Sequence, residues 1–480
     1  MGKTLNDQPQ ATAVADIEYF GEKLVLPEGM KLKDALNLIE RRMEFEEEET
    51  IFNETYDCFP LDGAHALDVV LTRKFGWAPA TATPGFFGKN PPAMLSVEVA
   101  PGVVKQVAWG RFSLPNIEGY VQTGAARKEN RICFSLNAKI KRKDERVVRA
   151  ILDEVRSYLK TGSIYMGKAI KIRFRDEQGQ PLDMPEPKFI DTSKIDPNAL
   201  IYAAPVQAAV ETNLFTPIRR VADLIANNIP VKRGVLLGGV YGTGKTMAAT
   251  VASKHAVDNS ITYLYIPRAD ELADAIEFAK QYQSPACVIF CEDIDRVTAG
   301  ERSVAMDDIL NMLDGIDTKN SHIITVLTTN DLEAINPAML RPGRLDAVID
   351  VTPPDANAVE RLLRLYAGEA IEASTNLEEA GRILAGNIPA VIAEVVKRAK
   401  LAQVGRQPAG QKVLHLSQQA VVEAAATLQS QIELLARRSA AQPPKTTISD
   451  LVIEAVKDVT HEPLNALQLK VQAIGEHIGV

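Results

Sequence analysis

The pattern of apolar and polar positions divides the chain into two halves of different texture. Up to about residue 174, short alternating runs typical of half-buried strands are mixed with amphipathic helical runs. The runs that predict strands are 93–99, 103–109, 132–136 and 168–174, and those that predict helices are 31–43 and 147–159. The first half therefore predicts a mixed α/β domain.

From about residue 199, strand-like apolar runs alternate regularly with helical runs. The predicted strands are 234–237, 261–266, 286–291, 323–327 and 347–351, and the helices between them are 246–256, 269–282 and 306–313. Such alternation favours a parallel sheet whose strands are joined by crossover helices. Beyond Pro353 and Pro354 the pattern is helical, so a helical subdomain is expected after the sheet.

These patterns, together with the Pro-rich polar stretch Asp176–Pro197, predict the order of the domains. The expected segments are a disordered tail (1–16), a partner-binding N-terminal α/β domain (17–174), a linker (175–198), a large α/β subdomain (199–354), a helical subdomain (355–440) and a helical C-terminal extension (441–480). Because a linker separates the first domain from the rest, we expect that residues 1–174 can be removed without loss of the chemistry of the second half.

Composition narrows the classes of protein that fit. The 480 residues carry 54 basic and 62 acidic side chains, a net charge of −8, which disfavours a nucleic-acid footprint along the whole chain. The longest apolar run, Ala286–Cys291, is far shorter than the roughly 18 residues that span a membrane. The chain has only 4 cysteines, without a CxxC pair, and its N-terminus lacks an apolar stretch. We therefore expect a cytoplasmic protein without a signal peptide or a disulfide scaffold.

A glycine-rich segment follows the first predicted strand of the second half. Gly239–Thr246 reads GVYGTGKT, which fits G-x-x-x-x-G-K-[ST] between an apolar strand and an Ala-rich helix. Glycines let backbone N–H groups wrap phosphates, and the helix N-terminus adds the positive end of its dipole. Lys245 is expected to neutralise the β- and γ-phosphates of ATP, and Thr246 to bind Mg²⁺. The expected nucleotide ligands are Gly239, Gly242, Thr243, Gly244, Lys245, Thr246 and Met247.

A second motif supplies the acidic half of such a site. The apolar strand predicted over 286–291 ends directly in Glu292 and Asp293. In a phosphate-binding-loop site, one carboxylate after such a strand lies near Mg²⁺ and the next activates the attacking water. Cys287 and Cys291, four positions apart on this strand, share a face and are expected to be core residues.

Residues from about 199 to 405 resemble the AAA ATPases in the strict sense, the group of segregases, proteasomal ATPases and membrane-bound AAA proteases. Besides the two motifs above, Ile323–Asn330 resembles the family's strand that ends in a sensor asparagine. Ala334–Asp346 resembles the family's second region of homology. The resemblance implies a P-loop NTPase fold with a helical lid, and a homo-oligomeric, hexameric ring with ATP at the subunit interfaces.

The same resemblance assigns further catalytic residues. Asn330 would help to position the attacking water. Arg341 and Arg344 would reach the γ-phosphate bound by the neighbouring subunit, where a guanidinium stabilises charge on the transferred group.

The acidic motif departs from the family, which has Asp-Glu where this chain has Glu292 and Asp293. In the simplest register Glu292 is the metal residue and Asp293 the catalytic base. The alternative is a shifted register in which Asp293 serves the metal and Asp295 is the base.

The segment that in the family carries an aromatic–hydrophobic–Gly pore loop is short here. The only aromatic residues between Ile266 and Tyr282 that could line a pore are Phe278 and Tyr282, and both fall on a predicted helix. Leu272, Ile276 and Ala279 give this helix an apolar stripe at i, i+4, i+7 spacing, which is better explained by packing on the sheet.

Three functions remain open at this point. The leading one is ATP-driven remodelling or disassembly of a protein partner that the N-terminal domain selects. An ATP-switched scaffold that does not thread its partner is favoured by the short pore segment. A nucleic-acid motor or loader has only the basic segment Lys139–Arg146 in its support.

Overall fold

The computed structural model describes residues 16–19, 22–25, 30–77, 80–129, 131–294, 321–332, 345–407, 410 and 415–428. The chain divides into two compact units, Met1–Pro353 and Pro354–Val480. Three predicted segments lie outside the described residues: positions 1–15 of the tail, the helix over 306–313 and the extension over 441–480. Among the residues that are described, no helix combines the length and apolar character needed to cross a membrane.

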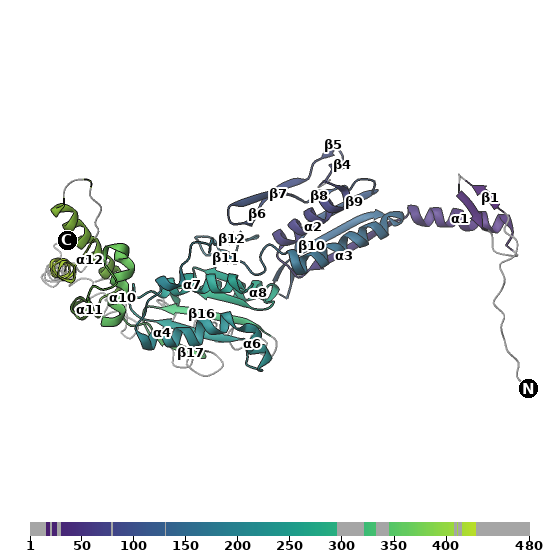
Figure 1. Cartoon of the computed structure of the whole chain (residues 1–480). Coiled ribbons are helices and arrows are strands. Elements are labelled where there is room, and N and C mark those ends of the chain that lie inside the picture. The colour runs from purple at the N-terminus through teal and green to yellow at the C-terminus, as the bar shows by residue number, and fades with distance from the viewer. Residues whose placement is uncertain are drawn as a thin grey trace, which may run out of the picture. The chain divides into compact units, whose positions relative to one another are not determined.

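A seven-stranded sheet, here called the central sheet, lies in the first unit (Figure 1), with the strand order β12-β11-β14-β15-β16-β13-β17. All neighbouring strands in it are parallel except β11 and β12. The strands are β11 (Ala169–Lys171), β12 (Lys188–Phe189), β13 (Arg233–Gly238), β14 (Thr262–Ile266), β15 (Cys287–Cys291), β16 (Ile323–Thr329) and β17 (Ala347–Asp350). The parallel α/β sheet predicted from the alternating pattern is confirmed.

The two faces of the central sheet belong to different hydrophobic clusters. Side chains alternate along β15, so Phe290 lies in one cluster while Cys287 and Cys291 lie in the other. Helix α7 (Lys245–Asp258) covers the first face and α8 (Leu272–Gln281) the second. Both cysteines are fully buried, which confirms their predicted place in the core.

Short helices that precede β13 in the chain pack on the α7 side. They are α4 (Ala204–Val210), a π-helical turn (Glu211–Phe215), α5 (Thr216–Arg219) and α6 (Val221–Ala226). Their buried side chains join the same cluster as α7, so this face of the sheet is closed by residues from its own neighbourhood in the sequence.

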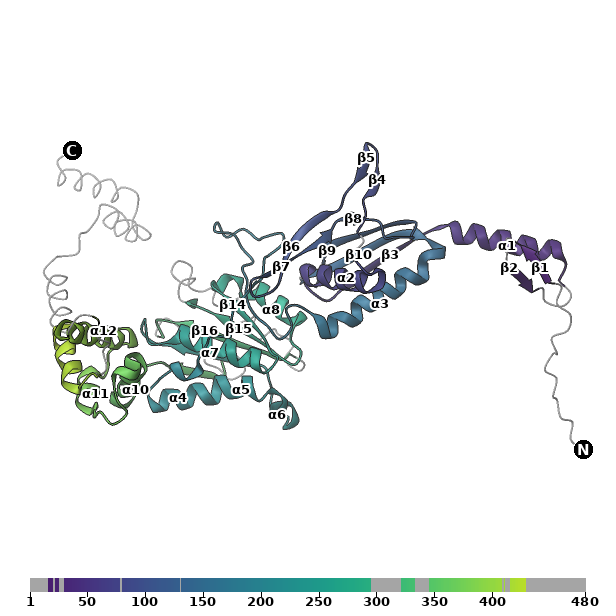
Figure 2. The same cartoon turned by 45° about the horizontal axis from the view of Figure 1, so that its top comes forward.

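The N-terminal part of the first unit contains a four-stranded antiparallel sheet, in the order β3-β10-β9-β8, covered by two helices. Its elements, together called the N-terminal layer, are β3 (Glu49–Tyr56), α2 (Pro60–Phe75), β8 (Arg111–Phe112), β9 (Gly119–Lys128), β10 (Arg131–Lys141) and α3 (Glu145–Gly162). Helices α2 and α3 lie side by side on it (Figure 2). The strand predicted at 132–136 and the helix predicted at 147–159 are confirmed, and both elements are longer than expected.

Helix α2 was not predicted. Most of its residues are buried, so it lacks the single apolar stripe by which a surface helix is found in a sequence. Its ends are nevertheless well marked, because Pro60 occupies the first turn and Gly76 adopts a left-handed conformation after the last.

Three hairpins complete the N-terminal half. They are β1 (Asp16–Tyr19) with β2 (Glu22–Val25), β4 (Thr83–Gly85) with β5 (Gly88–Asn90), and β6 (Ala93–Ala100) with β7 (Val103–Trp109). The last of these matches the strands predicted at 93–99 and 103–109, and its inner residues join the core under α2.

Helix α1 (Leu32–Glu47) continues four residues beyond its prediction, into an acidic run. There the acids meet the basic segment singled out in the sequence: Lys139 pairs with Glu49 at 2.6 Å, and Arg142 pairs with Glu48 at 3.1 Å. The basic charges are therefore largely matched by acids of the same chain. The basic segment Lys139–Arg146 then offers few unpaired charges to nucleic-acid phosphates and no longer favours nucleic-acid binding.

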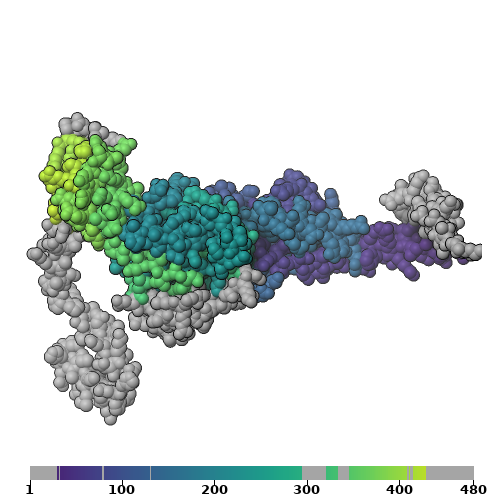
Figure 3. Space-filling model, turned by 60° about the horizontal axis from the view of Figure 1, so that its bottom comes forward, coloured from purple at the N-terminus to yellow at the C-terminus, as the bar shows by residue number. Residues whose placement is uncertain are grey.

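A single hydrophobic cluster runs from the N-terminal layer through α8 to the central sheet. Phe59, just before α2, lies 5.3 Å from Phe278 of α8, measured between ring centroids. Tyr282 donates its hydroxyl to Asp62 at 3.1 Å and accepts the Phe59 N–H at 2.8 Å. In Figure 3 the surfaces of the N-terminal layer (blue) and the central sheet (teal) adjoin accordingly. Phe278 and Tyr282 are only 4% and 1% exposed, which confirms that they pack inside the protein.

The structure differs from the predicted boundary between an N-terminal domain and a linker. Residues 169–171, expected in the N-terminal domain, form β11 and pair with β14. Residues 188–189, expected in the linker, form β12 at the edge of the same sheet. An alternating pattern identifies a half-buried strand but says nothing about the sheet that it joins, which explains the difference.

The second unit is helical over its described residues. Its helices are α10 (Ala356–Ala367), α11 (Glu378–Leu384) and α12 (Pro389–Arg406), followed by a helix over 418–428. Asp355 caps α10, because its Oδ1 accepts the backbone N–H of Ala358 at 2.8 Å.

Candidate functional site

The glycine-rich loop lies between β13 and α7. Gly239 and Gly244 have φ angles of 138° and 104°, which favour glycine. A Cβ at Gly239 would also come within 2.4 Å of the Val351 carbonyl oxygen, so no larger residue fits there. The loop turns directly into the first turn of α7, and the N-terminus of a helix is a favourable place for an anion.

Two side chains of the loop are held by hydrogen bonds to the loop's own backbone. The Lys245 Nζ donates to the carbonyl oxygens of Gly239 and Val240, at 2.6 and 3.0 Å, and the residue is buried. Thr243 is also buried, and its hydroxyl donates to Val240 at 3.0 Å. By contrast, Thr246 and the two remaining predicted ligands, Gly242 and Met247, are exposed. The loop thus holds its lysine in place while it leaves the Thr246 hydroxyl open to a ligand.

The two predicted carboxylates follow the carboxyl end of β15. Glu292 accepts a 2.6 Å hydrogen bond at Oε2 from the Tyr265 hydroxyl, which belongs to the neighbouring strand β14. Its Oε1 is buried and has no hydrogen-bond partner among the described residues. Burial raises the pKa of Tyr265, so its hydroxyl keeps the proton that it donates.

Asp293 is held differently from its neighbour. It adopts a left-handed backbone conformation, with φ 48°, and its N–H donates to the Thr328 hydroxyl at 3.0 Å. Its Oδ1 accepts a 2.9 Å hydrogen bond from Asn330 Nδ2. Thr328 and Asn330 lie at and just after the end of β16, so two adjacent parallel strands place the acid and the amide together.

The glycine-rich loop, the two acids and Asn330 all lie at the carboxyl ends of strands of the central sheet. β13 is flanked by β16 on one side and β17 on the other, although β14 follows it in the chain, so the strand order reverses at β13. In open α/β sheets ligands bind outside the carboxyl ends of the strands at such a reversal. The loop after β13 and the acids after β15 are therefore where a nucleotide site is expected.

The residues present fit a divalent cation beside the phosphates. Carboxylate and hydroxyl oxygens are the ligands that Mg²⁺ prefers, and it commonly keeps several waters. Glu292 offers a buried oxygen that no described residue satisfies, and Thr246 offers an exposed hydroxyl. Groups of three or more His, Cys, Asp or Glu side chains that would form an all-protein metal cage do not occur in the described part of the chain.

Three predicted residues cannot be placed. Arg341, Arg344 and Asp295 lie outside the described residues, so the arginine assignment and the shifted register both stay predictions.

Sequence reasoning missed two tyrosines of the site. Tyr265 orients Glu292, as described above. Tyr202 donates its hydroxyl to the Gly244 carbonyl at 2.8 Å and is buried against the loop. Neither belongs to a motif. The one signal in the sequence was that Tyr265 lies in the predicted strand that precedes the acidic strand along the chain.

The glycine-rich loop Gly239–Thr246, here called the P-loop, and an acidic strand on the same parallel sheet define a P-loop NTPase fold. Residues 235–353 match the family described as "ATPase family associated with various cellular activities (AAA)". The chain therefore contains an AAA domain, and its resemblance to that family is confirmed.

Curated relatives agree with this assignment. The chain is 30% identical over 191 residues to the ATP-dependent zinc metalloprotease FtsH of Helicobacter pylori, an alignment that covers 36% of this chain and 30% of the relative. It is 30% identical over 164 residues to the 26S proteasome regulatory subunit 4 homolog of Encephalitozoon cuniculi, covering 30% and 38%. A third relative, FtsH of Rhodococcus erythropolis, is 32% identical over 241 residues, covering 46% and 26%. The chain thus spans less than two fifths of the length of each of these relatives.

Proposed function

We propose that this protein is a Mg²⁺-dependent ATPase that works in a homo-oligomeric, hexameric ring and uses hydrolysis to remodel or disassemble a protein partner. The observation that carries the ATPase assignment is the pairing of Asp293 with Asn330 at 2.9 Å, beside a P-loop on the same sheet. The relatives' printed names, a metalloprotease and a proteasome subunit, support work on proteins. The N-terminal layer and its hairpins would select the partner.

The described side chains divide the chemistry between them. Lys245 and the N–H groups of the loop would bind the phosphates. Glu292 and Thr246 would hold Mg²⁺, which would supply positive charge beside the phosphates. Asp293 takes a proton from the water that attacks the γ-phosphorus, as the bond to the bridging oxygen breaks. Asn330 fixes the Asp293 carboxylate for this step.

The test of this assignment separates the two acids. Asp293→Asn should retain ATP binding but lower turnover by about 100-fold or more, within the range expected for loss of a general base. Glu292→Gln should instead raise the Mg²⁺ concentration needed for half-maximal rate. Both are measured by steady-state phosphate release at varied Mg²⁺, with equilibrium binding of a fluorescent ATP analogue as the control for folding. If Asp295→Asn stalls turnover while Asp293→Asn is near normal, the shifted register holds instead.

The ring is tested by mixing subunits. Arg341→Ala subunits should bind ATP but hydrolyse it slowly, and Lys245→Ala subunits should not bind it. A mixture should recover activity, because an intact site can then use an arginine from its neighbour. Turnover per subunit that is unchanged on dilution to monomer would contradict the ring.

A second function, an ATP-switched scaffold that holds its partner without threading it, is favoured by one observation. In the segment 266–282, which the structure describes throughout, both aromatic side chains after Ile266 are buried. Threading grips a polypeptide with exposed side chains, and this segment offers no aromatic one. If an unfolded protein stimulates ATP hydrolysis, the result supports remodelling by threading. If only one folded partner stimulates it, the result supports the scaffold.

A further inference from the structure

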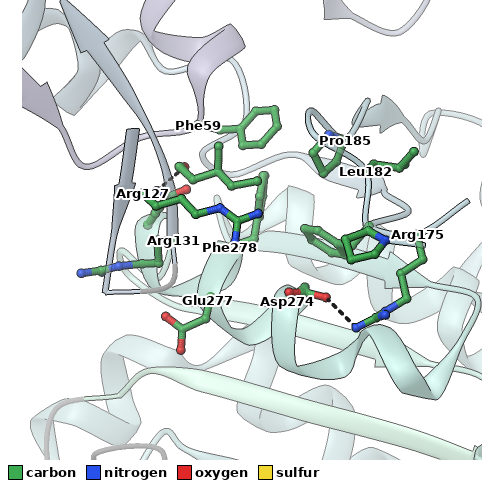
Figure 4. Close-up of a pocket in the computed structure, with 13 residues that line it drawn as sticks. Phe59, Arg127, Arg131, Arg175, Leu182, Pro185, Asp274, Glu277 and Phe278 are labelled. Atoms are coloured by element: carbon green, nitrogen blue, oxygen red, sulfur yellow. Dashed lines mark hydrogen bonds and ion pairs between the residues drawn. The ribbon is translucent and has the colours of Figure 1, made fainter. Parts of the chain in front are cut away.

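A cavity of about 200 Å³ lies where the N-terminal layer meets α8, apart from the candidate ATP site (Figure 4). Its walls come from three places: the turn between β9 and β10, the outer side of α8, and the segment between β11 and β12. All three belong to the same compact unit. Neither the P-loop nor the acids after β15 line it.

One side of the cavity is apolar. Phe59, Phe174 and Phe278 line it and are buried, and the ring of Phe278 lies 5.3 Å from that of Phe59 and 6.2 Å from that of Phe174. Leu182 contributes a further apolar side chain from the segment between β11 and β12. Water between such walls makes few hydrogen bonds, so the cavity favours an apolar group.

The other side carries cationic groups with few partners. Figure 4 shows Arg127 extending toward the middle of the cavity, where it makes no hydrogen bond or ion pair with any described residue. Arg175 lies across from it. One of its Nη nitrogens is 3.8 Å from the Asp274 carboxylate, the other donates to the Gly179 carbonyl at 3.2 Å, and its Nε is buried without a described partner.

The remaining charges that line the cavity are engaged elsewhere. Arg131 points away from the cavity in Figure 4 and pairs with Glu129 at 2.6 Å. Glu277 pairs with Lys280 on the same helix at 2.5 Å. The cavity thus presents surplus positive charge beside aromatic walls.

We propose that this cavity binds a carboxylate attached to a small apolar group, with Arg127 as the main anion ligand. A guanidinium matches the two oxygens of a carboxylate with two parallel hydrogen bonds. The apolar walls provide no donors for the further oxygens of a phosphate. The volume lies below the roughly 300–1,000 Å³ of pockets for drug-sized ligands, which fits a group of amino-acid size.

Two sources supply this chemistry: a free aliphatic or aromatic acid, and the hydrophobic C-terminal residue of a polypeptide. In either case the ligand contacts Arg127 of the N-terminal layer and Phe278 of α8 at once. Binding would therefore stabilise the junction between the two, and the melting temperature of the whole chain should rise with ligand concentration.

The experiment uses the full chain without nucleotide, so its result does not depend on ATP hydrolysis. The probes are 4-phenylbutyrate and its uncharged counterpart 4-phenylbutan-1-ol, titrated by calorimetry. The acid should bind with a dissociation constant on the order of 0.1–1 mM, as expected for a ligand of this size. The alcohol should bind at least about tenfold more weakly, since it cannot pair with Arg127.

Variants locate the site. Arg127→Gln should weaken the acid at least about tenfold, whereas Lys128→Gln, the same charge change on the other side of β9, should not. Leu182→Trp should exclude the acid by filling the cavity without a change of charge. Arg127 is exposed, so its variant should fold, and matching melting curves without ligand provide the check.

Peptides distinguish the two sources. A tetrapeptide that ends in leucine with a free carboxylate, compared with its C-terminal amide, reports capture of a chain terminus. If the free-carboxylate peptide binds more tightly than 4-phenylbutyrate, the ligand is a C-terminus; if it binds more weakly, the ligand is a small acid. The proposal is overturned if the acid binds no better than the alcohol, if Arg127→Gln binds like the unmodified chain, or if no probe binds at 10 mM.

Discussion

Helices α7 and α8, on opposite faces of the central sheet, connect it to very different surroundings. Helix α7 carries the nucleotide loop at its start and packs with α4 and α5, which immediately precede β13. Helix α8 packs on the opposite face and shares its hydrophobic cluster with the N-terminal layer. Tyr282, directly after α8, donates to Asp62, which lies 220 positions earlier in the chain. The helix that follows the glycine-rich loop and the helix that attaches the N-terminal layer thus lie on opposite faces of one sheet. A change on either face should leave the other largely intact.

The largest expected effect breaks the α7 face alone. Lys245→Ala removes the ammonium that we propose binds the phosphates of ATP, and charge-assisted hydrogen bonds of this kind contribute about 1.5–3 kcal/mol each. ATP binding should no longer be detected, while the melting temperature without nucleotide should fall only as far as the loss of the two hydrogen bonds from Lys245 to Gly239 and Val240 requires. Equilibrium binding of a fluorescent ATP analogue measures the first, and circular dichroism the second. An affinity within about twofold of the unmodified chain would refute the P-loop assignment.

A matched change breaks the α8 face. Phe278 is buried among the rings of Phe59, Tyr165 and Phe174, so Phe278→Ala should lower the free energy of unfolding by about 3–5 kcal/mol. ATP should still bind at temperatures well below the transition. Phe278→Leu, which keeps most of the volume, is the control and should cost much less. Urea denaturation followed by tyrosine fluorescence measures both; a loss below about 1 kcal/mol for alanine would show that the core is not continuous.

The smallest effect concerns the pH dependence of the same junction. Burial raises the pKa of Asp62 to about 6 from 3.8, against hydrogen bonds from Ser163, Ile164 and Tyr282 that lower it. A raised carboxyl pKa means that the folded state binds the proton more tightly. This contribution is fully present below about pH 4 and is lost as the pH rises through 6. At about 1.4 kcal/mol per pH unit, it amounts to about 3 kcal/mol at most.

Asp62→Asn removes this ionisation, so stability should vary less between pH 4 and 7 than in the unmodified chain. Melting temperatures at several pH values measure the difference. Parallel curves for the two proteins would show that Asp62 does not titrate in this range.

The α7 face could be predicted from sequence because its determinants are local. The spacing of Gly239, Gly244 and Lys245 within one short segment specifies both the turn and its ligand. The acids after β15 could be found for the same reason. Tyr265 could not, because its role arises only when β14 and β15 pair and its hydroxyl reaches Glu292.

The α8 face could not be predicted because it is assembled from distant segments. Phe59 and Phe278 each read as ordinary core residues, and nothing in either local pattern names the other. Likewise the strand predicted over 168–174 was assigned to the N-terminal domain, whereas residues 169–171 pair with β14 of the central sheet. The expectation that residues 1–174 are removable also loses its basis, since their loss would strip β11 from the sheet and uncover α8.

The shared core has a consequence for how the chain is made. The ribosome synthesises the N-terminal layer first. Tyr282, the hydrogen-bond partner of Asp62 and Phe59, is synthesised 220 positions after Asp62 and 223 positions after Phe59. At about 5–20 residues per second, this delay is on the order of 10–40 seconds. During that time the apolar surface that α8 will cover stays open to water, and β11 has no neighbour in its sheet. The nascent chain should therefore depend on chaperones that hold this surface until α8 arrives.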